Sequence, residues 1–161
     1  MKKHHKFFIR VISWIFFIIY LVCMVYFLFF SEQLGRVPSD EYKYSLEPFK
    51  EIRRYLTYRS EIGTFNVILN LLGNIVCFVP FGFVVPILSP RHKGFFKIAW
   101  LSFCVSLLVE LVQLVSKVGS CDVDDIILNT LGGITGYLLF ACSNRCLHHL
   151  LSLQKRKKEK E

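Results

Sequence analysis

Four stretches of this sequence are apolar enough to cross a lipid bilayer, and this property constrains the fold more than any other. A helix rises about 1.5 Å per residue, so about 20 apolar residues match a hydrocarbon core about 30 Å thick. The stretches cover residues 11–30, 66–88, 95–115 and 123–142 of the 161-residue chain, in which 53% of residues are hydrophobic. A soluble domain of this length does not need four such segments. We therefore expect one all-α membrane domain over residues 1–161, a polytopic bundle of four transmembrane helices.

The first stretch has the basic flank of a signal peptide, because Lys2, Lys3, Lys6 and Arg10 precede it. Its apolar part is longer than the roughly 7–15 residues of a typical signal-peptide core. No cleavage site with small residues follows, only Phe29-Phe30-Ser31-Glu32. We therefore predict a retained transmembrane helix.

The positive charge is unevenly distributed, and its distribution predicts the topology. Lysine and arginine are in excess before residue 11, in the turn 89–97 and in the tail 143–161, whereas 31–65 is balanced and 116–125 is acidic. Loops rich in lysine and arginine stay in the cytoplasm, so we expect a multi-pass protein of the cell membrane with both termini cytoplasmic. The net charge of +8 then reflects topology anchors that contact anionic membrane lipids, and we expect no nucleic-acid partner.

The first outer loop contains a short amphipathic pattern. Between residues 48 and 58, Phe49, Ile52, Tyr55 and Leu56 recur at helical spacing with charged residues between them. Pro48 suits the first turn of a helix. The pattern predicts a short amphipathic helix, either at the outer membrane interface or over the mouth of the bundle. A helical linker with solvated charges is the alternative.

Three of the stretches carry polar residues on single helical stripes, at about 100° per residue. A carboxylate in hydrocarbon costs about 2.5–3.5 kcal/mol on insertion scales, and the predicted topology places these residues together in the outer leaflet. The predicted polar site consists of Asn70, Asn74, Glu110, Gln113, Asp122, Asp125 and Asn129. Asp124 lies off this stripe, so we expect it to face water or headgroups. The stripe continues as Gly132, Gly133 and Gly136, whose small-xxx-small spacing predicts close helix packing.

These polar groups have two interpretations. They can serve only as interhelical hydrogen bonds, worth about 0.6 kcal/mol each. However, Glu110, Asp122 and Asp125 have only Lys117 nearby as a cation, so they would repel and raise one another's pKa. They need a cation, an arginine, a shared proton or a cationic ligand, and their oxygens suit Mg²⁺ or Mn²⁺. We favour a functional site, with these three carboxylates as the metal candidates.

Three ordered blocks resemble those of VanZ-like membrane proteins. The blocks are Asn-Ile-Val-Cys-Phe-Val-Pro-Phe-Gly at 74–82, Glu-Leu-Val-Gln at 110–113 and Asp-Val-Asp-Asp-Ile-Ile-Leu-Asn-Thr-Leu-Gly-Gly at 122–133. Pro48-Phe49 resembles the short segment that this family carries in its outer loop, so the likeness runs from about Leu46 to Tyr137. The resemblance implies a bacterial cell-envelope protein linked to resistance to teicoplanin-type lipoglycopeptide antibiotics. It identifies no reaction.

Three functions remain open. The first is a non-enzymatic protein that binds a lipid headgroup, a lipid-linked wall precursor or the lipoglycopeptide. The second is an intramembrane enzyme acting on a lipid-linked phosphate, with Glu110 or Asp125 as general base or metal ligand. The third is a small transporter, which would require an oligomer because four short helices enclose little space. No Ser/His/Asp set and no arginine clamp for phosphate is visible, so the sequence names no catalytic residue.

Overall fold

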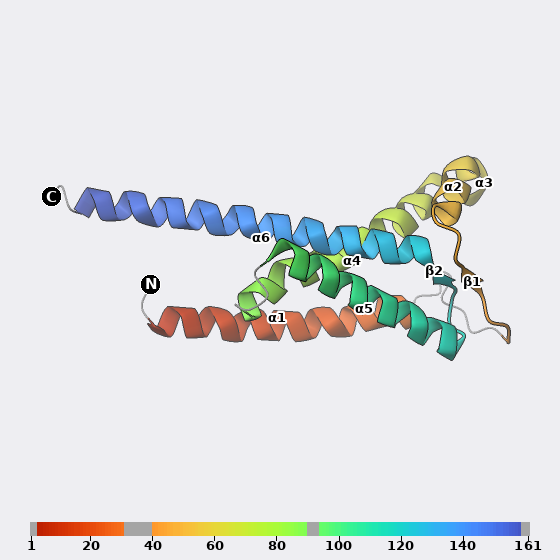
Figure 1. The fold of residues 1–161 in the computed structure, drawn as a ribbon, viewed down its shortest axis with the longest axis horizontal. Helices are drawn as coiled ribbons and strands as arrows, with labels where there is room; N and C mark the ends of the chain where they lie inside the picture. The colour runs from red at the N-terminus through yellow and green to blue at the C-terminus, as the bar shows by residue number, and fades with distance from the viewer. Residues whose placement is uncertain (1–2, 31–39, 90–93, 159–161) are drawn as a thin grey trace.

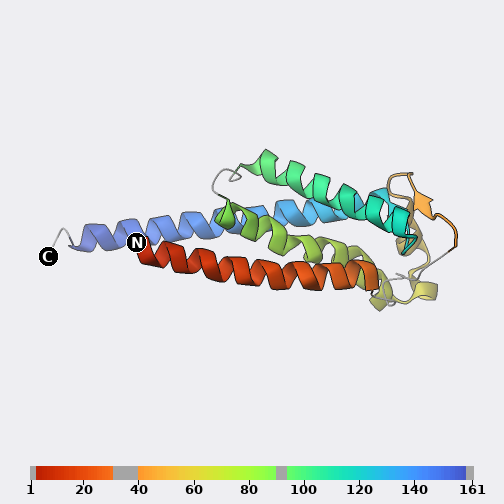
Figure 2. The same cartoon turned by 90° about the horizontal axis from the view of Figure 1, so that it is seen from below.

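Four long helices make up most of the protein in the computed structural model, which describes residues 3–30, 40–89 and 94–158. They lie alongside one another (Figures 1 and 2) and are α1 (Lys3–Phe30), α4 (Thr64–Leu88), α5 (Phe95–Ser116) and α6 (Val123–Lys158). Each contains a segment long and apolar enough to cross a membrane, namely Val11–Phe30, Thr64–Leu88, Phe95–Ser116 and Val123–Gln154. The predicted all-α, four-helix membrane bundle is therefore confirmed.

The outer surface of the bundle is strongly apolar. Large side chains such as Phe16, Phe96, Trp100 and Val115 are 65–83% exposed. An apolar surface of this extent is typical of helices that face lipid. The chain is thus a multi-pass membrane protein.

Helices α1 and α4 pack against each other around a proline in α4. The rings of Phe17 and Phe81 lie 6.3 Å apart between their centroids. The Tyr20 hydroxyl donates a hydrogen bond of 2.8 Å to the Cys77 carbonyl oxygen, one turn before Pro80. A proline inside a helix removes a backbone donor. Pro80 would have donated to the Val76 carbonyl, so the hydroxyl of α1 bonds the carbonyl next to the gap in the α4 ladder.

Helices α4 and α6 approach each other through glycines on both sides. A Cβ atom placed on Gly82 would lie 1.9 Å from the carbonyl oxygen of Gly133. A Cβ on Gly132 would lie 2.1 Å from the Ile75 carbonyl oxygen, and one on Gly136 2.0 Å from that of Val79. Gly132 and Gly136 therefore lie against the backbone of α4. Gly133 meets α4 through its carbonyl at Gly82, whereas a Cβ on Gly133 would lie 2.0 Å from the Ser102 hydroxyl oxygen of α5.

Short elements gather at the end of the bundle opposite the two termini (Figure 1). Strand β1 (Tyr44–Ser45) pairs in parallel with β2 (Cys121–Asp122), with Tyr44 opposite Cys121 and Ser45 opposite Asp122. Two short helices follow β1, α2 (Lys50–Thr57) and α3 (Arg59–Ile62). Helix α2 is the amphipathic helix predicted for the outer loop. The strand pairing holds this loop against the turn between α5 and α6.

Helix α6 runs to Lys158, well beyond the end at residue 142 that hydropathy predicted. The segment predicted as a basic tail is therefore helical as far as the structure describes it. No glycine or proline follows Gly136, and Leu147, Leu150 and Leu153 continue within the helix. Hydropathy predicts where a helix leaves the membrane, which differs from where the helix ends.

Candidate functional site

The end of the bundle that carries the short elements also holds a buried polar cluster. Its side chains come from α5, from β2 and from the first turns of α6. Its buried polar residues are Ser106, Glu110, Gln113, Asp122, Asp124 and Asn129, each at most 7% exposed. Ser102 is also buried but lies further along α5, beside Gly133. Most of the residues predicted for the polar site therefore lie in one region.

Asp122 fixes the turn between α5 and α6. Its Oδ1 accepts the backbone N–H of Asp124 at 2.9 Å, which places it at the N-cap of α6. The backbone N–H of Asp122 donates a hydrogen bond of 2.9 Å to Oε2 of Glu110 on α5. Burial raises the pKa of Asp122 to about 7, against the opposing effect of the hydrogen bond from Asp124, and the charges of Asp125, Asp124 and Glu51 raise it further.

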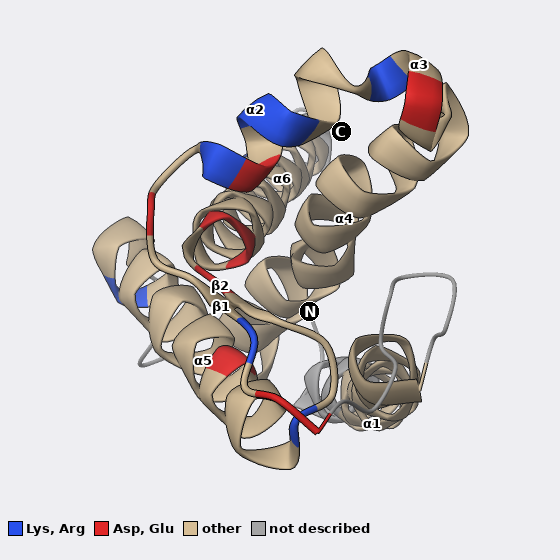
Figure 3. Cartoon of the chain, turned by 90° about the vertical axis from the view of Figure 1, so that its right-hand side faces the viewer, with Lys and Arg blue, Asp and Glu red and all other residues tan. Residues whose placement is uncertain are grey.

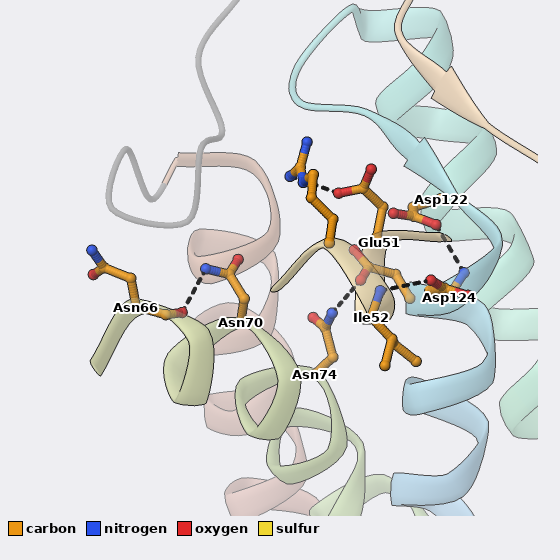
Figure 4. Close-up of polar contacts among 9 residues, drawn as sticks. Glu51, Ile52, Asn66, Asn70, Asn74, Asp122 and Asp124 are labelled. Carbon is orange, nitrogen blue, oxygen red and sulfur yellow. Dashed lines mark hydrogen bonds and ion pairs between the residues drawn. The ribbon is translucent and has the colours of Figure 1, made fainter. Parts of the chain in front are cut away.

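Asp124 joins the bundle to helix α2. One of its carboxylate oxygens accepts the backbone N–H of Phe49. The other accepts the backbone N–H of Ile52 at 3.0 Å, as Figure 4 shows. These donors belong to the first turn of α2, where N–H groups have no partner within the helix. The expectation that Asp124 faces water was wrong: it is 1% exposed, because α2 covers that side of α6.

Phe49 begins α2 in a conformation that is unfavourable for its residue type. Its φ is 63°, in the left-handed region. A bulky residue there costs on the order of 1–3 kcal/mol and persists only when its surroundings hold it. The hydrogen bond from the Phe49 N–H to the Asp124 carboxylate stabilises this backbone conformation.

Asn74 contacts the carboxylates, whereas the other asparagines of its stripe do not. The Asn74 amide donates to Oδ1 of Asp125 (Figure 4). Asn66 and Asn70 donate instead to carbonyl oxygens one turn earlier in their own chain, Ile62 at 2.9 Å and Asn66 at 2.8 Å. The structure therefore leaves Asn70 apart from the other residues of the predicted site.

Two amides lie deeper and link helices. The Asn129 amide donates a hydrogen bond of 2.9 Å to the Ser106 hydroxyl oxygen, and this bond joins α6 to α5. The Gln113 amide donates a hydrogen bond of 2.8 Å to the Leu28 carbonyl oxygen, so this side chain points to α1 and away from the carboxylates. The carbonyl oxygens of both side-chain amides are buried and accept no hydrogen bond from the described residues.

The carboxylates obtain their partners from N–H groups. Lys117 was the cation expected near the carboxylates. Its amine instead donates a hydrogen bond of 2.8 Å to the Asp40 carbonyl oxygen and lies 4.8 Å from the ring centroid of Tyr42. Glu110, Asp122 and Asp125 each accept an N–H instead. Among the residues that the structure describes, no group of three or more acidic, histidine or cysteine side chains could hold a metal ion. The Mg²⁺ or Mn²⁺ site expected at Glu110, Asp122 and Asp125 stays a prediction.

Helix α2 presents different residues to the bundle and to the surroundings. Ile52 and Tyr55 are half-buried, whereas Arg53 and Arg54 are exposed. The guanidinium of Arg54 lies 2.6 Å from a carboxylate oxygen of Glu51 and 5.2 Å from the centroid of the Tyr55 ring. In Figure 3, α2 lies beside the first turn of α6, which carries acidic residues.

An open depression of about 290 Å³ lies along the exposed side of α2. Its lining includes Glu47, Lys50, Arg53, Arg54 and Tyr58. No residue of this depression was predicted for the site. The helical spacing of Lys50, Arg53 and Arg54 could have indicated a basic surface here. From the sequence alone, however, such a surface looks the same as charges that only face solvent.

The sequence was also compared with known proteins. The sequence model of the family described as VanZ/LLP1 matches residues 17–144, which include the polar cluster, α2 and parts of all four long helices. The chain belongs to the VanZ/LLP1 family. It is 26% identical over 130 residues to Protein VanZ of Enterococcus faecium, an alignment that covers 79% of this chain and 72% of that protein. No solved structure matches this VanZ/LLP1 chain.

Proposed function

We propose that this VanZ/LLP1 protein lowers the susceptibility of a bacterial cell to teicoplanin-type lipoglycopeptides by binding a lipid or wall-precursor headgroup at the outer membrane surface. Both termini are then cytoplasmic. Family membership supports the link to resistance. The charge distribution supports the orientation, because the balanced outer loop and the acidic turn lie at the end opposite the termini.

The buried polar cluster, joined to α2 through Asp124, carries this proposal. A membrane protein retains buried carboxylates at considerable cost, and they are usually functional. Here their bonds order the α5–α6 turn and seat α2 on the end of the bundle. The cluster thus holds α2 and the α5–α6 turn in fixed positions at the end of the bundle opposite the termini.

Binding agrees with this geometry better than catalysis does. A general base must reach its substrate within about 3 Å, whereas Glu110 is 1% exposed and accepts the N–H of Asp122. Asp125 is bonded to Asn74. The cluster therefore positions the surface that contacts the ligand.

The test is the teicoplanin susceptibility of a sensitive Gram-positive host expressing the protein. Glu110→Gln and Asp125→Asn variants are compared at matched membrane levels, with Glu61→Gln on the exposed helix α3 as the control. We expect the wild type and the control to raise the inhibitory concentration several-fold and both cluster variants to lose most of that effect. Equal protection by all four proteins would show that the cluster serves packing alone.

A further inference from the structure

The depression on α2 is built from one face of a helix. Lys50, Arg53, Arg54, Thr57 and Tyr58 all line it, at spacings of three, four, seven and eight residues from the first. Residues at these spacings lie on one side of an α-helix. The lining is therefore a single continuous surface.

This surface carries an excess of positive charge. Lys50, Arg53 and Arg54 contribute three cations to the lining, and the carboxylate of Glu47 also lines it. Arg54 pairs with Glu51 at 2.6 Å, which leaves an excess of one positive charge on this side of α2. Glu47 lies 3.7 Å from the Lys50 amine with both side chains well exposed, an ion pair of little strength. Arg53 makes no ion pair with any described residue, so its five N–H donors are free to bind an anion.

Exposed apolar residues border the basic surface. Phe49 is 56% exposed, Leu56 59% and Tyr58 49%. The transmembrane helix α4 begins at Thr64, only a few residues after Tyr58, so α2 lies close to the end of a membrane span. Aromatic residues are favoured at the membrane–water interface. A ligand bound here would have a phosphate beside the cations and a lipid chain beside the apolar residues.

The position of α2 is fixed by the bundle. Asp124 holds both Phe49 and Ile52 by their backbone N–H groups, and α2 therefore keeps its basic face turned away from α6. The side chain of Asp124 is bound to the backbone and does not reach this face. Asp124 is thus a positioning residue for the surface that Lys50 and Arg53 form.

We propose that Lys50, Arg53 and Arg54 bind the phosphate of a lipid headgroup at the membrane surface. Guanidinium groups bind phosphate oxygens through paired, charge-assisted hydrogen bonds. The inference rests on the proposed function for the identity of the lipid, and it moves the ligand contact from the buried carboxylates to α2.

Binding is measured with the full-length protein in phosphatidylcholine nanodiscs. Farnesyl diphosphate is the lipid probe, and inorganic diphosphate and farnesol, which lacks phosphate, are the comparison ligands. We expect saturable binding of farnesyl diphosphate that weakens as salt is raised, and much weaker binding of the other two. A Lys50→Gln/Arg53→Gln variant should bind the probe about tenfold more weakly or worse.

The matched control is Lys43→Gln/Arg59→Gln, which removes two exposed cations of the same loop outside the depression. It should bind farnesyl diphosphate like the wild type. An equal loss in the control, equal binding of inorganic diphosphate or farnesol, or no saturable binding by the wild type would overturn the inference. Protection from teicoplanin without binding would overturn the inference alone, whereas α2-dependent binding without protection would overturn the proposed function alone.

Discussion

The carboxylate of Asp124 accepts the backbone N–H of Ile52 at 3.0 Å, across 72 residues of sequence. Asp124 lies in the first turn of α6 and Ile52 in the first turn of α2. One side chain therefore connects a transmembrane helix with the loop that contains α2. The loop adopts its position because the bundle supplies acceptors that α2 lacks at its N-terminus.

Removing the Asp124 carboxylate should loosen α2. Replacing a capping residue with alanine costs about 0.5–2 kcal/mol, so we expect Asp124→Ala to increase hydrogen exchange in the segment 49–57 while the exchange of α4 and α5 stays unchanged. Asp124→Asn keeps one acceptor oxygen and should give an intermediate result. Glu61→Ala, on α3, is the control. Unchanged protection of 49–57 in Asp124→Ala would contradict the role assigned to this residue.

Stability should depend on pH through Asp122. Its pKa is raised from 3.8 to about 7 in the folded protein, chiefly by burial. The folded state therefore binds a proton more tightly than the unfolded state, and the stabilisation present below pH 3.8 is lost as the pH rises through about 7. We expect the midpoint of thermal unfolding in detergent to fall between pH 5 and pH 8.

The control for this slope is Asp122→Asn, which mimics the protonated side chain and retains an acceptor for the Asp124 N–H. This variant should lose most of the pH dependence over the same range. A wild-type midpoint that is constant, or that rises with pH, would show that Asp122 does not dominate the titration.

Gln113 should stabilise the end of α1. Its amide donates to the Leu28 carbonyl, which lies in the last turn of α1, where carbonyl groups have no partner within the helix. Gln113→Leu leaves that carbonyl buried without this donor, but it also removes the unpartnered amide oxygen. We expect a net loss of about 1 kcal/mol and faster hydrogen exchange near Leu28, measured against Val112→Leu on the exposed side of α5. Identical exchange in the two variants would contradict this link.

Much of this architecture could be predicted from the sequence, because a bilayer restricts the possible structures. Apolar length determines the four helices, and the small-xxx-small spacing of α6 indicated where another backbone could approach. The direction of each span then brought Glu110, Asp122 and Asp125 to the same end. These features depend on periodicity and length, which the sequence states directly.

The remaining details depend on partners distant in sequence. A helical projection treats the side of α6 that carries Asp124 as open, whereas α2 covers it. The same projection places Asn70 beside Asn74, yet Asn70 bonds to its own helix because the carbonyl of Asn66 is within reach. Such competition between local and distant partners requires coordinates.

The glycine contact between α4 and α6 leads to a prediction with a control in the same helix. A Cβ on Gly82 would overlap the Gly133 carbonyl oxygen, whereas one on Gly73 meets no atom within 4 Å. Gly82→Ala should therefore force the two helices apart at a cost of about 1–3 kcal/mol or more, and Gly73→Ala should be neutral or stabilising by up to about 1 kcal/mol. Thermal unfolding of both variants in the same detergent measures the difference. Because both substitutions add the same methyl group to the same helix, equal midpoints would show that the backbones do not meet at Gly82.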